Sequence, residues 1–146
     1  MTETSIKAPW HLWLVGIVAV LFNSIGAFDF VMAMAHGAKY MESAGMSPKQ
    51  IAHYEAMPGW MTAVWAVGVW TAFIASILLL LRRKAAFPIF VASVAAFLVH
   101  LLYTYVLSNG GAVMGQQMAI TSAVIVILLL FFSWYSRAMT KRGVLR

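Results

Sequence analysis

Four long apolar runs constrain this chain more than any other feature of its sequence. They cover about residues 10–33, 60–81, 87–107 and 113–134. Each is long enough to cross a hydrocarbon core of about 30 Å, which requires roughly 20 residues of helix. Backbone groups cannot stay unpaired in lipid, and the alternation typical of a barrel strand is absent, so each run is predicted to be a helix. We therefore expect an all-α fold, a bundle of four transmembrane helices in one integral membrane domain, residues 1–146.

The composition agrees with a membrane protein. Hydrophobic residues make up 63% of the chain, whereas soluble domains average about 45–50% apolar residues. The longest remaining piece, the connection over about residues 35–59, is too short for an independent domain. The chain has no cysteine, which excludes disulfides, iron–sulfur clusters and zinc–thiolate sites.

The basic residues predict the orientation of the bundle. The connections on one side hold Lys39 and Lys49, and the flanks on the other side hold Lys7, Arg82, Arg83, Lys84, Arg137, Lys141, Arg142 and Arg146. Because basic residues stay in the cytoplasm, both termini are predicted to be cytoplasmic, with residues 135–146 as a basic tail. The net charge of +6 is thus a topology signal, and we expect the lipid bilayer, and no nucleic acid, as its partner.

A short helix is predicted in the outer connection between the first two spans. Ser47 suits an N-cap and Pro48 a first helical residue, so a helix is expected from Ser47 to about Ala56. Ile51, Tyr54 and Met57 recur on one of its faces, which fits an interfacial helix on the membrane surface. A solvated loop helix is the alternative.

Two polar side chains interrupt the first apolar run. Asn23, Gly26 and Asp29 fall within an arc of about 120° on a helix, so they share a face. A carboxylate in hydrocarbon costs about 2.5–3.5 kcal/mol, so this face is predicted to point into the bundle. His100 and Tyr103 lie three residues apart in the third run, at a similar depth.

These positions define a candidate polar cluster, formed by Asn23, Asp29, His100 and Tyr103, if the first and third spans touch. Asp29 would then pair with Tyr103 or His100. The alternative is structural: Asp29 reaches interfacial water or caps loop N–H groups, and Asn23 bridges two helices.

The second run adds two deep aromatic residues and a glycine. Trp65 and Trp70 are candidates for lining a solute path or facing a partner. Gly68, like Gly26 in the first run, is expected to let a neighbouring helix approach closely.

No cofactor is expected. A haem held between two axial histidines needs them at matched depths on separate helices, and only His100 lies well inside a span. Neither His-x-x-x-His nor Glu-x-x-His occurs within a span, so no metal site is predicted.

Three stretches, "PWHLWLVGIVAVLFNSIGAFDFVM", "MPGWMTAVWAVGVWTAFIASILLLLRRKAAFPIF" and "RGVLR", resemble a family of small four-span inner-membrane proteins of proteobacteria. Some members carry the automatic label "sugar transporter". The resemblance covers most of the chain and implies a bacterial inner (cytoplasmic) membrane location. It provides no ligand residues, and His100 departs from the apolar or hydroxyl residue expected there.

Two functional hypotheses follow. The first is a non-enzymatic accessory or scaffold subunit that packs against other membrane protein subunits or against itself. The second is a small carrier or channel for a neutral solute such as a sugar, or for protons. Because one chain has too few helices to enclose a wide path, the second hypothesis predicts a homo-oligomer.

Overall fold

The computed structural model describes residues 7–108 and 110–146, and all the regular elements within these ranges are helices. In order they are α1 (Trp10–His36), α2 (Ala38–Ser43), α3 (Pro48–Glu55), α4 (Gly59–Leu80), α5 (Ala86–Leu102), a π-helical turn η1 (Tyr103–Leu107) and α6 (Gly110–Lys141). Four segments are long and apolar enough to cross a membrane: Trp10–His36, Gly59–Leu80, Ala86–Leu107 and Met118–Lys141. The predicted all-α class and its four long apolar helices are confirmed.

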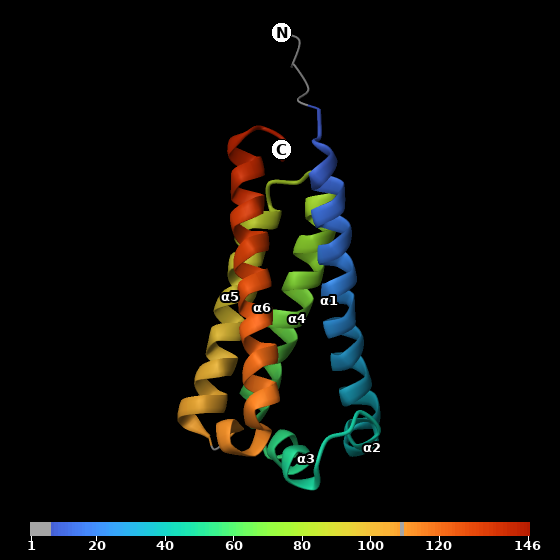
Figure 1. The fold of residues 1–146 in the computed structure, drawn as a ribbon, viewed down its shortest axis with the longest axis vertical. Coiled ribbons are helices and arrows are strands. Elements are labelled where there is room, and N and C mark those ends of the chain that lie inside the picture. The colour runs from blue at the N-terminus through green and yellow to red at the C-terminus, as the bar shows by residue number, and fades with distance from the viewer. Residues whose placement is uncertain (1–6, 109) are drawn as a thin grey trace.

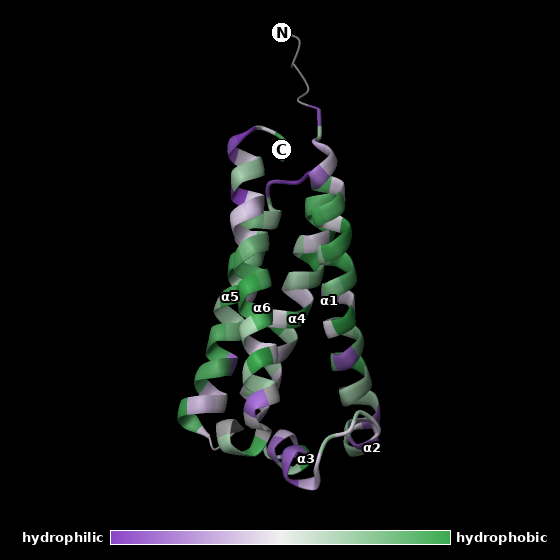
Figure 2. Cartoon of the chain, in the orientation of Figure 1, coloured by the Kyte–Doolittle hydropathy of each residue, from purple (hydrophilic) through white to green (hydrophobic). Residues whose placement is uncertain are grey.

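The four long helices form an elongated bundle in which α4 packs against both α1 and α5, and α5 packs against α6 (Figure 1). The C-terminus, the start of α1 and the α4–α5 turn share one end, which we call the terminal end. The short helices α2 and α3 lie at the opposite end, which we call the connection end (Figure 1). Hydrophilic residues gather towards these two ends, and the shaft between them is mostly hydrophobic (Figure 2).

Large apolar side chains cover the outside of the shaft. Examples from α1 and α6 are Leu21, Ile25, Phe28, Ile120, Ile127 and Leu130, each at least half exposed. A continuous apolar surface of this kind is a liability in water. It costs little in a bilayer, because lipid tails are as apolar as leucine. The exposed surface therefore fits a multi-pass membrane protein in contact with lipid.

The tightest packing lies at the terminal end. Buried side chains of all four long helices meet there, including Leu12, Leu79, Phe90 and Phe132. Gly16 is part of this packing, because a Cβ atom at this position would lie 2.3 Å from Leu80 Cδ2. Gly16, and not the Gly26 expected from the sequence, is therefore the close approach of α1 to α4.

The C-terminal residues belong to this core, which corrects the expectation of a basic tail over residues 135–146. Helix α6 continues to Lys141, and Val144 and Leu145 are buried. The Arg146 N–H donates to the Arg82 carbonyl at 2.9 Å, and the Lys84 N–H donates to the Arg146 carbonyl at 3.1 Å. The chain end is therefore fastened across the α4–α5 turn.

The structure has a helix, α3, at the residues where the connection helix was predicted. The Ser47 hydroxyl accepts the Gln50 N–H at 3.2 Å, and the Gln50 side chain accepts the Ser47 N–H at 2.9 Å, so the two residues form a capping box. Helix α2 was not predicted. It follows Gly37, whose φ of 56° ends α1 in a conformation that favours glycine.

The start of the last span differs from its expected position at residue 113. Gly115 has φ 77° and interrupts the helical backbone of α6. The part of α6 that is long and apolar enough to cross a membrane is Met118–Lys141.

Candidate solute-binding cavity

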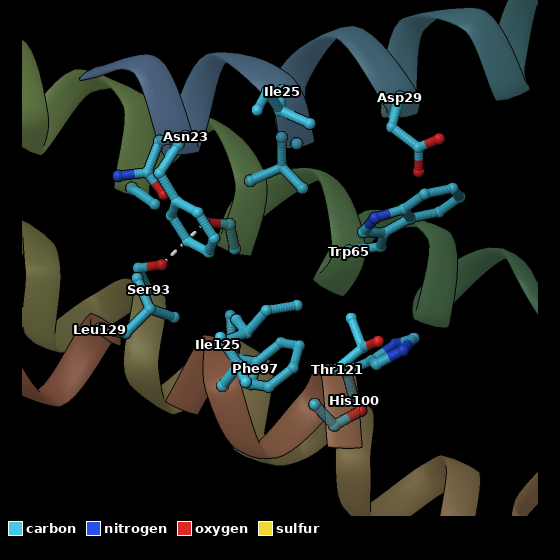
Figure 3. Close-up of a pocket in the computed structure, with 18 of the residues that line it drawn as sticks. Asn23, Ile25, Asp29, Trp65, Ser93, Phe97, His100, Thr121, Ile125 and Leu129 are labelled. Carbon is cyan, nitrogen blue, oxygen red and sulfur yellow. Dashed lines mark hydrogen bonds between the residues drawn. The ribbon is translucent and has the colours of Figure 1, made fainter. Parts of the chain in front are cut away.

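A cavity of about 760 Å³ lies inside the half of the bundle nearer the connection end. Helices α1, α4, α5 and α6 line it, and Tyr40 of α2 and Tyr54 of α3 contribute from the connection end. Asn23, Asp29, Trp65 and His100, all singled out in the sequence, line this one cavity (Figure 3).

The cavity opens sideways, between α1 and α6. Its lining residues from α4 and α5, such as Ala72 and Ser93, are buried or half-buried. Its exposed lining residues come from α1 and α6, for example Ile25 at 68% and Ile120 at 58% exposure. The buried residues form the floor of the cavity and the exposed ones form its rim. The mouth therefore opens on the side of the apolar shaft, and not at either end of the bundle.

Aromatic contacts explain why the mouth closes towards the terminal end. There α1 and α6 meet through a hydrogen bond between the His11 ring and the Tyr135 hydroxyl. Further along the bundle the rings of Phe22 and Phe132 lie 6.4 Å apart. The cavity begins just beyond this pair, where Phe22 also lines it.

Asn23 is held at the inner end of the cavity. Its Nδ2 donates to Ser76 Oγ of α4 at 2.7 Å, and Ser76 Oγ donates in turn to the Ala72 carbonyl at 2.7 Å. Asn23 therefore bridges α1 and α4, as the structural alternative expected. Hydrogen bonds between membrane helices contribute about 0.6 kcal/mol on average.

The two glycines expected at helix contacts behave differently. Around Gly68, a Cβ atom would lie 3.5 Å from Ala96 Cβ, and the Ser93 hydroxyl donates to the Gly68 carbonyl at 2.8 Å. Gly68 therefore does lie where α4 and α5 approach. A Cβ atom on Gly26 would meet no atom within 4 Å, so the expectation of close packing at Gly26 is wrong. Gly26 leaves space in the cavity wall instead.

Asp29 has a different partner from those expected. The Tyr40 hydroxyl donates to Asp29 Oδ1 at 2.7 Å. The ring of Tyr103 instead lies 6.2 Å from that of His53 and 5.8 Å from that of Trp60, and Tyr103 is not among the cavity residues. The physical reason is the helix order, since α4 and not α5 is the main neighbour of α1.

His100 lines the cavity from α5 and is only 8% exposed. Its ring stacks on Phe97 with centroids 6.0 Å apart. Its Nδ1 atom is buried and has no hydrogen-bond partner in the described part of the chain. A buried polar atom without a partner is rare in native structures, and a bound molecule or water commonly completes such a site.

Aromatic rings form the wall between Asp29 and His100. Trp65 lies edge-on to Phe30 at 4.9 Å and 5.8 Å from the ring of Tyr54. Figure 3 shows Asp29, Trp65 and His100 together at one end of the cavity, with Asn23 and Ser93 at the other. The ring centroid of Trp70 lies 6.5 Å from that of Phe30, but Trp70 does not line the cavity.

The phenols at the connection end respond to the Asp29 charge. The hydrogen bond to Asp29, burial and the carboxylate charge together raise the pKa of Tyr40. Burial, and then the Asp29 charge, raise the pKa of Tyr54 to about 12. Burial lowers the pKa of His53 in the same helix.

We predict that α3 leaves the cavity wall in strong base. The folded state holds the Tyr54 proton more tightly than the unfolded chain, so the contribution of Tyr54 to stability is complete below pH 10 and is lost between pH 10 and about 12. In a variant that keeps Trp65 as its one tryptophan, a pH titration should show a change in fluorescence in this range, and adding Tyr54→Phe should remove most of that change. An unaltered transition in Tyr54→Phe would contradict the role of Tyr54.

Part of the site carried no sequence signal. Tyr54 stood on the apolar face of the expected connection helix, but Tyr40, Ser76 and Ser93 were missed. Tyr40 lies in α2, where no periodic pattern marks a helix. Ser76 and Ser93 are isolated hydroxyls in apolar runs, where serine often bonds only its own helix.

The cavity wall holds few polar groups. Among the residues that the structure describes, no group of three or more His, Asp or Glu side chains could hold a metal ion. The wall offers one carboxylate, one amide, one imidazole, a few hydroxyls and an indole, set in aliphatic and aromatic surface. No protein-family model, curated protein or solved structure matches this chain.

Proposed function

We propose that this protein binds a small, largely apolar solute in the cavity and acts as a carrier, not as an enzyme. The observation that supports the proposal most directly is the 760 Å³ cavity that Asp29, Trp65 and His100 line together. Ligand sites in proteins typically have volumes of about 300–1,000 Å³ and mostly apolar walls with a few polar groups. A bundle that served only as a scaffold would gain nothing from leaving this space open.

The lateral mouth determines how a solute would enter. The rim is formed by exposed side chains of α1 and α6, most of them apolar, such as Ile25 and Ile120, and two of them polar, Asp29 and Thr121. A solute dissolved in the membrane would enter between these two helices. One chain does not enclose a path, since its wall is open between α1 and α6. Carriage across the membrane therefore requires a second copy of the chain or a movement of α1 relative to α6.

We further propose a bacterial inner-membrane location with both termini in the cytoplasm. Eight of the ten basic residues flank the terminal end, which supports this orientation. The resemblance to small four-span proteobacterial proteins supports the same location. In this orientation, α2 and α3 lie on the outer side and Asp29 lies near the outer interface.

A cavity-filling variant tests the proposal. Gly26→Leu should place a side chain into the cavity, because a Cβ atom at this position meets nothing within 4 Å. Replacing a glycine inside a helix also stabilises that helix by about 1 kcal/mol. Native mass spectrometry after mild detergent extraction should detect a bound small molecule on the wild type and none on Gly26→Leu. An identical ligand load on both proteins would contradict the proposal.

The accessory-subunit hypothesis is the second candidate, and one observation favours it. The exposed rim residues, such as Phe28 at 60% exposure, leave an apolar seam between α1 and α6 that another transmembrane helix could cover. The same extraction separates the two functions. A stoichiometric membrane subunit that remains bound to Gly26→Leu would favour the accessory role, whereas a discrete homo-oligomer with a small ligand would favour carriage.

A further inference from the structure

The cavity carries one uncompensated negative charge. All ten Lys and Arg residues lie in the described ranges, and none of them lines the cavity. Asp29 accepts the Tyr40 hydroxyl but forms no ion pair with any described residue. The carboxylate therefore lies exposed at the rim of the cavity, with the Tyr40 hydroxyl as its hydrogen-bond partner and no Lys or Arg side chain of the cavity wall to neutralise it.

The surroundings of Asp29 favour a positive partner. The flat rings of Tyr54 and Trp65 line the same end of the cavity, and aromatic faces attract cations by about 0.5–2 kcal/mol each. The Asp29 charge also helps to raise the pKa of the Tyr54 phenol, so its field extends to this ring. An anionic ligand would meet repulsion from this carboxylate, and no Lys or Arg side chain lines the cavity to offset it.

The rest of the wall restricts the body of the ligand. Phe22, Phe97, Ile125 and Leu129 are among the apolar side chains that line the cavity. A sugar placed against these side chains would leave several hydroxyls without partners, and each unsatisfied buried group costs about 1–3 kcal/mol. The ligand should therefore have a small charged part and a large apolar part.

His100 supplies an independent sign that the site is incomplete without a ligand. It is more than nine-tenths buried, it lines the cavity, and its Nδ1 lacks a partner in the described residues. Its ring lies at the same end as Asp29 and Trp65 (Figure 3). A molecule or water bound in the cavity would give Nδ1 the partner that the described residues do not supply.

We propose that the cavity binds a hydrophobic organic monocation, an inference that rests on the proposed function. Its charged part lies against Asp29 and the rings of Tyr54 and Trp65, and its apolar body lies along Phe97 and Leu129. The cation enters from the membrane between α1 and α6. The transport hypothesis from the sequence named a neutral solute such as a sugar, whereas this proposal names a lipophilic cation.

Two probes of equal shape and opposite charge test this proposal. Tetraphenylphosphonium and tetraphenylborate are titrated into the full-length protein in phosphatidylcholine nanodiscs, and empty nanodiscs correct for partition into lipid. We expect saturable binding of the phosphonium with at least tenfold higher affinity than that of the borate. Asp29→Asn should weaken phosphonium binding at least tenfold, which corresponds to about 1.4 kcal/mol.

A matched control separates the effect of the Asp29 charge from the effect of the net charge of the protein. Glu42 is an exposed acidic residue of α2 that does not line the cavity, so Glu42→Gln should bind the phosphonium within twofold of the wild type. If Asp29→Asn does not fold, the wild-type preference between the two probes still decides the matter. Equal affinity for both probes, or unchanged binding in Asp29→Asn, would overturn the proposal.

The outcomes also distinguish this proposal from the function on which it rests. If both probes bind equally and both are lost in Gly26→Leu, the cavity binds solutes without charge preference, and only the cation proposal fails. If neither probe binds and no small molecule accompanies the extracted protein, both proposals fail.

Discussion

Replacing Gly16 with leucine is expected to destabilise the bundle by about 3 kcal/mol, the upper part of the range for inserting carbon atoms into a packed core. A Cβ atom at this position would lie 2.3 Å from Leu80 Cδ2 and 2.9 Å from Leu80 Cγ. If Gly16 were replaced by alanine, a movement of the Leu80 side chain could relieve the clash with the single added methyl group. It would not make room for a whole leucine, because Leu12, Ala19 and Leu79 fill the surrounding core. The two helices would have to separate at the terminal end.

Gly26→Leu is the matched control for this prediction, since it makes the same change ten residues later on the same helix. A Cβ atom on Gly26 meets nothing within 4 Å, so we expect unchanged or higher stability. Thermal unfolding of both variants in the same detergent, followed by circular dichroism, measures the difference. Equal midpoints for the two variants would show that α1 does not pack against α4 as described.

Truncating Leu145 to alanine should destabilise the protein by about 2–5 kcal/mol, the range for removing a buried leucine from a packed core. Leu145 is only 3% exposed and lies in the same core as Leu12, Phe90 and Met139. Its neighbour Arg146 bonds the backbone of Arg82 and Lys84 on the α4–α5 turn, and Arg82 Nε donates to the Val144 carbonyl at 3.1 Å. Loss of the leucine should therefore loosen both the chain end and this turn.

Leu130→Ala is the control, because Leu130 is 51% exposed on the lipid-facing side of α6. Lipid tails can replace the contacts of a side chain that already faces the membrane, so we expect a loss well below that of Leu145→Ala. Unfolding in detergent and the rate of proteolysis near the C-terminus measure both variants. A loss for Leu130→Ala as large as that for Leu145→Ala would contradict the burial of the chain end.

Local features of the chain were predictable. The four long helices follow from apolar runs of sufficient length, and α3 follows from Ser47 and Pro48, whose capping chemistry acts over three residues. The inward face of Asn23 was also predictable, because a polar amide in a membrane helix needs a partner. Its partner Ser76 was not, since several hydroxyls lie at a similar depth.

Helix pairing could not be read from the sequence, and it decided the candidate site. Asp29, His100 and Tyr103 were expected together only if the first and third spans touch. The structure has α4 as the main neighbour of α1, so Tyr40 bonds Asp29 and Tyr103 packs against His53 and Trp60. Asp29 and His100 still reach one cavity, but from different walls of it.

The sequence alone therefore determined the helix content, the four long spans and the presence of polar groups within them, because length, hydropathy and capping are properties of short stretches of chain. Only the tertiary structure decided which helices pack, where the cavity opens and that the chain end is buried. The physical reason is the solvent. In a bilayer the outward face of a helix is as apolar as its inward face, so hydropathy does not indicate which face meets a neighbour. The choice is made by the fit of side chains, such as Leu80 against Gly16, between residues far apart in the sequence.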